Sequence, residues 1–145
     1  MKKEKDIFIE GPIEPSFIAN SIEKHRSKHE IGAHDIFLGQ VRADFHEKQT
    51  VSAIEYTAHQ QVANTMASEI REKAFEKFGI SCMHIHHSLG KIATGELCLF
   101  VFASSPHRDE CRKAVSWLVE EVKQKLPIFG KVILDNNEHQ WKVNT

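Results

Sequence analysis

The hydrophobic positions of this chain change along its length between the spacing of helices and the spacing of strands. Apolar residues recur three or four positions apart in three segments, which predict helices over residues 15–25, 60–78 and 104–126. Alternating or continuous apolar runs predict strands at residues 6–9, 32–41, 51–58, 80–89, 97–103, 132–134 and 140–143. The polar segment 43–50 lacks periodicity and is expected to be a mobile loop. Helices and strands that only partly alternate indicate an α+β fold.

The two long predicted helices each carry an apolar face. In the second, Val62, Met66, Ile70 and Ala74 lie in helical register, and Gly79 follows its end as a capping glycine. The buried stripe expected for the third helix consists of Ala114, Val115, Leu118, Val119 and Val122. The nearly continuous apolar run at 97–103 predicts a central strand that is covered on both faces.

Length and composition limit the class of protein. With 145 residues, 41% of them hydrophobic and 27% charged, the chain is expected to form one globular domain over residues 1–145. A net charge of −1 gives no reason to expect a nucleic-acid partner. No apolar run approaches a membrane span or a signal-peptide core, so we expect a cytoplasmic protein without a membrane partner. The three cysteines lack CxxC spacing and are expected to be buried.

Three nearby histidines, His84, His86 and His87, raise the question of a metal site. On a strand, His84 and His86 share one face and His87 points to the other, and no cysteine or carboxylate stands at ligand spacing. The glycine-rich phosphate loop and the H-E-x-x-H motif are also missing from the sequence. We therefore predict a solvated strand face, no metal and no cofactor.

The start of the third predicted helix is a candidate anion site. His107 and Arg108 lie in its first turn, where the helix dipole disfavours a positive side chain. Exposed backbone N–H groups, the dipole and a guanidinium would together bind an anion such as phosphate. Alternatively, Arg108 pairs with Asp109 or Glu110 at the surface, and these residues alone do not decide between the two interpretations.

Positive side chains also occur at the other end of that helix. Lys123 lies near an apolar segment, where a partly desolvated lysine can act as a base or nucleophile. A lysine at a helix C-terminus also simply complements the dipole. Arg42, at a strand end beside a loop, is a candidate ligand clamp. We expect Trp117, Phe129 and Trp141 to belong to the core and not to a binding site.

Five segments, in order along the chain, resemble motifs of the large subunit of molybdopterin synthase. They are residues 36–42, like its G-x-V-R strand end; 54–58, like its next strand; 86–96, like H-R-x-G-x-x-x-x-G-[DE]; 105–108, like S-x-H-R; and 123–131, like K-x-x-x-P-[IF]-W-K. Trp141 also matches a tryptophan near the family's C-terminus. The matches are collinear from about Gly32 to Trp141.

The resemblance implies an α/β hammerhead-type fold, with three main helices on a mixed, largely antiparallel sheet. It implies a sulfurtransferase that converts a cyclic pyranopterin monophosphate to molybdopterin. Two sulfurs would come from the C-terminal thiocarboxylate of a small ubiquitin-like sulfur-carrier subunit. The implied substrate-binding residues are Gln40, Val41, Arg42, His107, Arg108, Lys123 and Lys131. Of these, Lys123 and Lys131 are implied to be catalytic.

One departure from the family pattern concerns the second lysine. The family has lysine directly after the aromatic of P-[IF]-W-K, where this chain has Gly130, and Phe129 replaces the tryptophan. Because the distance from Pro127 to Trp141 is one residue longer than expected, an inserted Gly130 would restore Lys131 to this role. The alternatives are an inactive relative and a non-catalytic protein that binds a phosphorylated ligand.

Helix geometry adds an expectation about assembly. Arg108 and Lys123 would be separated by about 22 Å on one helix, and a pterin phosphate is too small to contact both. We therefore expect a homodimer in which His107 and Arg108 of one copy complete the pocket of the other. The resemblance implies such a dimer, flanked by two small subunits in a heterotetramer.

Overall fold

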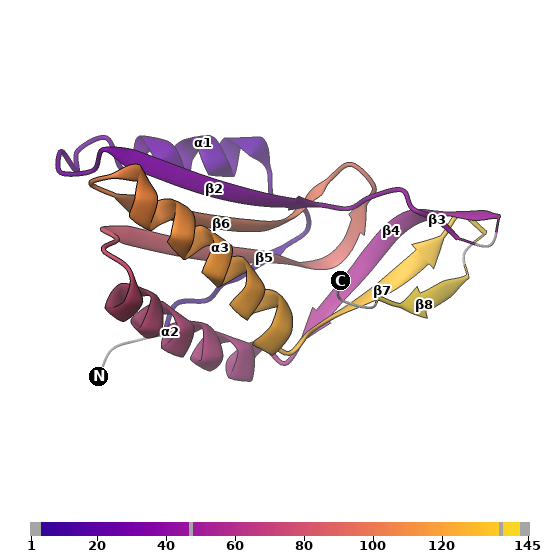
Figure 1. Cartoon of the computed structure of the whole chain (residues 1–145). Coiled ribbons are helices and arrows are strands. Elements are labelled where there is room, and N and C mark those ends of the chain that lie inside the picture. Colours follow the sequence, from indigo (N-terminus) through magenta and orange to yellow (C-terminus); the bar gives the residue numbers. More distant parts are fainter. Residues whose placement is uncertain (1–3, 47, 137, 143–145) are drawn as a thin grey trace.

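The structure is a computed structural model that describes residues 4–46, 48–136 and 138–142, and it contains helices packed on a mixed sheet (Figure 1). The elements are β1 (Phe8–Glu10), α1 (Pro15–Glu23), β2 (Ala33–Gln40), β3 (Phe45–His46), β4 (Gln49–Ala58), α2 (Gln60–Lys77), β5 (Cys82–Ala93), β6 (Leu97–Ser105), α3 (Arg108–Lys125), β7 (Ile128–Leu134) and β8 (His139–Trp141). The strand order is β2-β6-β5-β4-β7-β8. β1 pairs in parallel with β5, and the other described pairings are antiparallel. The predicted fold class is confirmed.

The helices cover one part of the sheet and leave the other extended. Figure 1 shows α2 and α3 on one face of the β2-β6-β5 part and α1 on the opposite face, with β4, β7 and β8 reaching past the helices. β6 lies between two apolar clusters. Phe100 and Phe102 belong to the cluster on the α1 side and Val101 to the α3 side, and all three are 0% exposed. The prediction of a doubly covered central strand is confirmed.

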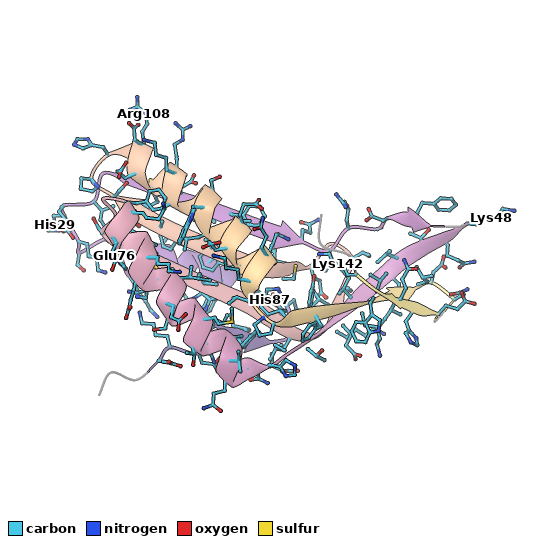
Figure 2. All side chains as sticks on the ribbon, turned by 60° about the horizontal axis from the view of Figure 1, so that its bottom comes forward. His29, Lys48, Glu76, His87, Arg108 and Lys142 are labelled. Atoms are coloured by element: carbon cyan, nitrogen blue, oxygen red, sulfur yellow. The ribbon has the colours of Figure 1, made fainter. Side chains whose placement is uncertain are left out.

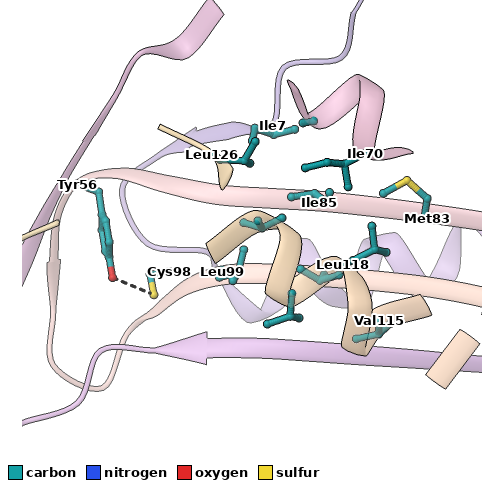
Figure 3. Close-up of a cluster of buried hydrophobic side chains, with 14 of the residues drawn as sticks. Ile7, Tyr56, Ile70, Met83, Ile85, Cys98, Leu99, Val115, Leu118 and Leu126 are labelled. Carbon is teal, nitrogen blue, oxygen red and sulfur yellow. Dashed lines mark hydrogen bonds between the residues drawn. The ribbon is translucent and has the colours of Figure 1, made fainter. Parts of the chain in front are cut away.

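The buried face of α2 differs in part from the predicted one. Ala63 and Ala67 are buried together with Ile70 and Ala74, whereas Val62 is 54% exposed. Small alanine side chains let the helix backbone lie close to the sheet, so Ile70 reaches the core beside Ile7 and Ile85 (Figure 3). The stripe predicted for α3 is confirmed, with Cys111 added to it.

Several element boundaries also differ from the predictions, and the strand expected at 132–134 begins already at Ile128 as β7. The expected loop at 43–50 contains β3, which pairs with the start of β4. β5 extends to Ala93, past the predicted strand end at residue 89, because Gly90 (φ 90°) lets the strand bend as it leaves β6 and joins β4. The residues expected to open the third helix end β6 instead, and the hydroxyl of Ser105 accepts a hydrogen bond from the Cys111 N–H at 3.0 Å. Within the described residues, no helix is long and apolar enough to cross a membrane.

Candidate active site

A cavity of about 620 Å³ lies where β5 leaves β6 and joins β4, beside the C-terminal end of α3. Phe37, Leu99, Val122, Leu126 and Ile128 contribute to its apolar wall. Its polar and charged lining residues are Gln40, Arg42, Asp44, Tyr56, His87, Cys98, Lys123, Gln124 and Lys142. Arginine and lysine side chains therefore reach this cavity from three separate segments, while the described lining includes a single carboxylate. This excess of positive charge suits an anionic ligand.

Arg42 follows the end of β2 and can change partner at low cost. Its guanidinium donates two hydrogen bonds to the Asp44 carboxylate, at 2.8 Å and 3.2 Å. Both side chains are largely exposed, at 81% and 54%, and exposed ion pairs contribute about 1 kcal/mol or less. The preceding Val41 is 1% exposed and is fixed by backbone hydrogen bonds to Glu96 and Gly95, so it anchors the strand end.

Lys123 reaches the cavity from the last turn of α3. It lies between buried Val122 and the buried Leu126 that follows the helix, and its side chain is half-buried. Lys125, in the same turn, is turned away and pairs with Glu121 at 2.9 Å. The two lysines therefore share the favourable helix terminus, but only Lys123 is among the lining residues.

A tyrosine and a cysteine form the inner part of the cavity. The Tyr56 hydroxyl donates to Cys98 Sγ at 3.5 Å, and the Cys98 thiol donates to the Gly39 carbonyl at 3.5 Å (Figure 3). Burial, and then the neighbouring Cys98, raise the pKa of Tyr56, so its phenol stays protonated. The three cysteines are buried, as predicted, and Cys98 is at the same time a lining residue.

His87 is a neutral histidine in the cavity wall. Its Nδ1 lies 2.8 Å from the Ser88 carbonyl, which can only accept, so Nδ1 carries the proton and Nε2 is an acceptor. Burial lowers the pKa of His87 to about 4, and the charges of Lys123 and Lys142 act in the same direction. The ring therefore adds no positive charge to the cavity near neutral pH.

We expect the stability of the fold to fall between pH 6.5 and pH 4. An unfolded histidine binds a proton below about pH 6.5. Folded His87, with a pKa of about 4, stays unprotonated over this range. Its contribution to the free energy of unfolding is therefore complete above pH 6.5 and is lost as the pH falls toward 4. At pH 5 this loss is about 2 kcal/mol in the free energy of unfolding. Urea unfolding at pH 7.5 and pH 5 measures it.

The matched variant for this test is His87→Gln, which keeps a donor for the Ser88 carbonyl but does not titrate. It should lose less stability than the wild type over the same pH interval. His84, whose pKa burial also lowers to about 4, should account for part of the remaining loss. Equal pH dependence of the wild type and His87→Gln would contradict the assignment.

Two lysines near Gly130, Lys131 and Lys142, differ in whether they line the cavity. Gly130 lines the cavity, whereas Lys131 is not among its described lining residues and pairs with Glu55 at 3.1 Å. Lys131 and Glu55 are cross-strand partners of β7 and β4, with side chains on the face away from Ile54. Lys142, directly after β8, does line the cavity.

His107 and Arg108 lie at the opposite end of α3 from the cavity. Both are exposed, and Figure 2 shows Arg108 far from His87 and Lys142. In the described part of the chain Arg108 forms no ion pair with Asp109 or Glu110. Glu110 instead accepts a hydrogen bond from the Gly79 N–H and lies 3.9 Å from Lys113. One copy of the chain thus brings together Gln40, Arg42 and Lys123, and leaves His107 and Arg108 apart.

Several residues of the cavity were missed or misassigned from the sequence. Phe129 and Trp141, predicted to be core, are 44% and 64% exposed and line the cavity. Trp117 packs against the core, as predicted. The sequence could have indicated Tyr56, because it lies two residues after Ile54 on a predicted strand and therefore on the same face. Nothing in the local pattern distinguishes Lys142.

For His84 and His86, the predicted direction of the side chains is confirmed, whereas the predicted solvated surroundings are wrong. They share a face and His87 points away, but α1 packs over that face, so both rings are only partly exposed. His84 stacks on Phe102, with ring centroids 5.7 Å apart, and its Nε2 lies 3.2 Å from Nε2 of His25. The sequence predicts the helix that became α1, but it does not indicate that this helix packs over these two histidine rings.

Fold and cavity together define an α+β domain with a cation-lined pocket at one end of its helix-covered sheet. The MoaE protein family matches residues 11–125. The molybdopterin synthase catalytic subunit of Bacillus subtilis is 34% identical over 130 residues, covering 90% of this chain and 79% of the relative. The chain therefore belongs to the MoaE protein family.

Solved structures share the fold. Molybdopterin synthase from Staphylococcus aureus superposes with a TM-score of 0.81 at 24% identity, covering 99% of both chains. A complex of subunits 1 and 2 of the molybdopterin-converting factor from Helicobacter pylori gives a TM-score of 0.79 at 17% identity, covering 92% of this chain and 87% of that one.

The curated relatives differ in length. The catalytic subunit from Emericella nidulans is 29% identical over 83% of this chain, which spans 62% of that relative. The one from Drosophila melanogaster is 33% identical over 78% of this chain, which spans 31% of it.

Proposed function

We propose that this chain is the catalytic large subunit of a molybdopterin synthase. Its substrate would be a cyclic pyranopterin monophosphate, and its sulfur donor the thiocarboxylated C-terminus of a small ubiquitin-like carrier. The observation that carries the proposal is the convergence of Arg42, Lys123 and Lys142 on one partly apolar cavity. Membership of the MoaE family, and the names of the relatives, support the choice of reaction.

The proposed reaction exchanges oxygen for sulfur and balances without an oxidant. The thiocarboxylate sulfur bonds to a pterin carbon, and the carbon–oxygen bond at that carbon breaks, so that the oxygen leaves as water after protonation or, where it belongs to the cyclic phosphate, stays on the phosphate as that ring opens. Water then attacks the acyl carbon, the acyl C–S bond breaks, and the carrier departs as a carboxylate. Two such exchanges give the dithiolene. Each acyl hydrolysis passes through an oxyanion, which a nearby ammonium group stabilises.

We assign roles by position in the cavity. Lys123 stabilises the developing negative charge, and Gln40 and Arg42 orient the pterin, with Arg42 exchanging Asp44 for the ligand. Val41 holds the strand end from which both act. Lys131, the other lysine implied by the resemblance, would have to leave Glu55 before it could contribute.

The proposed assembly is a homodimer with a carrier subunit bound to each copy. His107 and Arg108 lie too far along α3 to reach the cavity of their own copy, so a second copy would supply them to hold the phosphate. The described conformation supports this role, because His107 caps α3 with extended backbone and makes no side-chain capping hydrogen bond. The Helicobacter complex of two subunits supports a small-subunit partner.

A reconstitution assay tests the function. The purified chain is incubated with the thiocarboxylated carrier and the pterin precursor, and dithiolene product is measured together with the carboxylated carrier. A synthase should form both, with two carriers consumed for each pterin. Binding of both components without product would instead support the inactive or purely ligand-binding alternative.

A further inference from the structure

The cavity holds a lysine that neither the sequence motifs nor the resemblance singled out. We propose that Lys142 acts beside Lys123 as a second cation that contacts the carrier's thiocarboxylate and stabilises its charge during sulfur transfer. This inference rests on the proposed function. Its structural basis is the position of Lys142 opposite Gly130 of β7, a residue without a side chain.

Lys142 and Gly130 are neighbours on the cavity face of the sheet. The β7–β8 pairing brings Lys131 opposite Trp141, and the Lys142 N–H donates to the Gly130 carbonyl at 2.8 Å. A Cβ atom at residue 130 would lie 3.5 Å from the Lys142 Cβ, so the two positions share a face. The Lys142 stem therefore starts from the cavity wall.

The packing around Gly130 explains why a lysine comes from residue 142 and not from residue 130. A Cβ at 130 would lie 3.0 Å from Ile54 Cγ2 and 3.2 Å from Tyr56 Cε1, closer than ordinary contact. Both of those side chains are buried and have little room to move. A longer side chain at 130 would displace this wall, whereas Lys142 enters the cavity without doing so.

Strand alternation turns Lys131 the other way. Its ammonium group is 3.1 Å from Glu55, and that ion pair lies on the opposite face from Gly130. For Lys142, by contrast, no carboxylate lies within ion-pair distance among the residues that the structure describes, and Asp44 is held by Arg42. Lys142 is thus the better placed of the two lysines to meet an anionic ligand in the cavity.

The electrostatic surroundings of Lys142 favour an anion. The charged and titratable groups that line the cavity with it are Arg42, Asp44, Tyr56, His87, Cys98 and Lys123. Partial burial, followed by the charges of Lys123 and Arg42, lowers the pKa of Lys142, although the residue as a whole remains exposed. A bound thiocarboxylate would relieve the repulsion among these cations, and this gain is available only when the ligand is present.

The decisive variants remove or conserve the charge at residue 142. Lys142→Met keeps most of the side-chain length, and should reduce dithiolene formation by roughly tenfold or more and raise the KM for the carrier. Lys142→Arg should recover most of the rate, which a loss of packing alone would not predict. Lys131→Met should lose less activity than Lys142→Met. Thermal unfolding midpoints of the three variants should stay close to that of the wild type.

Two results would overturn the inference. One is wild-type turnover by Lys142→Met, and the other is a larger loss in Lys131→Met than in Lys142→Met. If the wild type itself forms no product, the proposed function is wrong. Calorimetric titration with thiocarboxylated carrier then still tests Lys142, because Lys142→Met should bind it roughly tenfold more weakly. Equal affinities would reject the contact.

Discussion

Replacing Lys123 by alanine is expected to reduce dithiolene product to background, a loss of about 10²–10³-fold in the rate. Lys123 lines the cavity from the last turn of α3, beside the apolar wall formed by Val122 and Leu126. An ammonium group in such partly desolvated surroundings stabilises an oxyanion more than it would in water. Single-turnover measurements with preformed thiocarboxylated carrier give the rate of the chemical step.

The same variant should keep its fold and bind the carrier nearly as well as the wild type. Alanine favours the helix, and the buried stripe of α3 does not include Lys123. Lys125→Ala is the matched control, because Lys125 lies in the same turn but pairs with Glu121 outside the cavity. It should retain the wild-type rate. Unimpaired turnover by Lys123→Ala would remove its catalytic assignment.

The elements could be predicted from the sequence wherever burial imposes a regular period. The run at 97–103 became β6, and the stripe at Ala114, Leu118 and Val122 became the inner face of α3. Predictions failed where tertiary contacts override the local pattern. β3 forms in a polar segment because it pairs with β4, and β5 passes through Gly90 because that glycine permits a bend between two partner strands.

The cavity was harder to predict, because its members meet only through strand register. Arg42 and Lys123 stood out as charged residues at element ends, a local signal. Lys142 follows an exposed tryptophan in a short strand, and its role depends on its position opposite Gly130. The sequence pattern led to an inserted Gly130 that would restore Lys131, but strand alternation in the structure directs Lys131 toward Glu55.

For the histidines of β5, the sequence predicts which strand face each side chain is on, but not what covers that face. Alternation along β5 correctly separates His87 from His84 and His86, since this is a property of one strand. Whether each face is wet depends on what covers it, and neither α1 nor the cavity wall could be assigned to these faces from the sequence. Covered faces lower the pKa of both His84 and His87 to about 4. Because His87 is neutral near pH 7, the positive charge among the described cavity-lining residues comes from arginine and lysine.

Two inactive variants are expected to restore activity to each other if the site is shared between copies. Arg108→Ala should lose the phosphate contact and Lys123→Ala the catalytic cation, so each homodimer alone is inactive. In a hybrid dimer, one site carries both substitutions and the other carries neither. The purified hybrid should therefore show about half of the wild-type rate, since a two-fold dimer has two equivalent sites.

Coexpression of the two variants with different affinity tags, followed by sequential purification on both tags, isolates the hybrid for this measurement. A mixture of the two separately purified homodimers, assayed before the subunits exchange, provides the control and should remain inactive. The result depends on geometry, because residues 108 and 123 are held at opposite ends of α3. If both residues served one site within a single copy, each site of the hybrid would carry one substitution. An inactive hybrid that is folded and dimeric would therefore contradict the shared site, while leaving the role of Lys123 to be judged by its own variant.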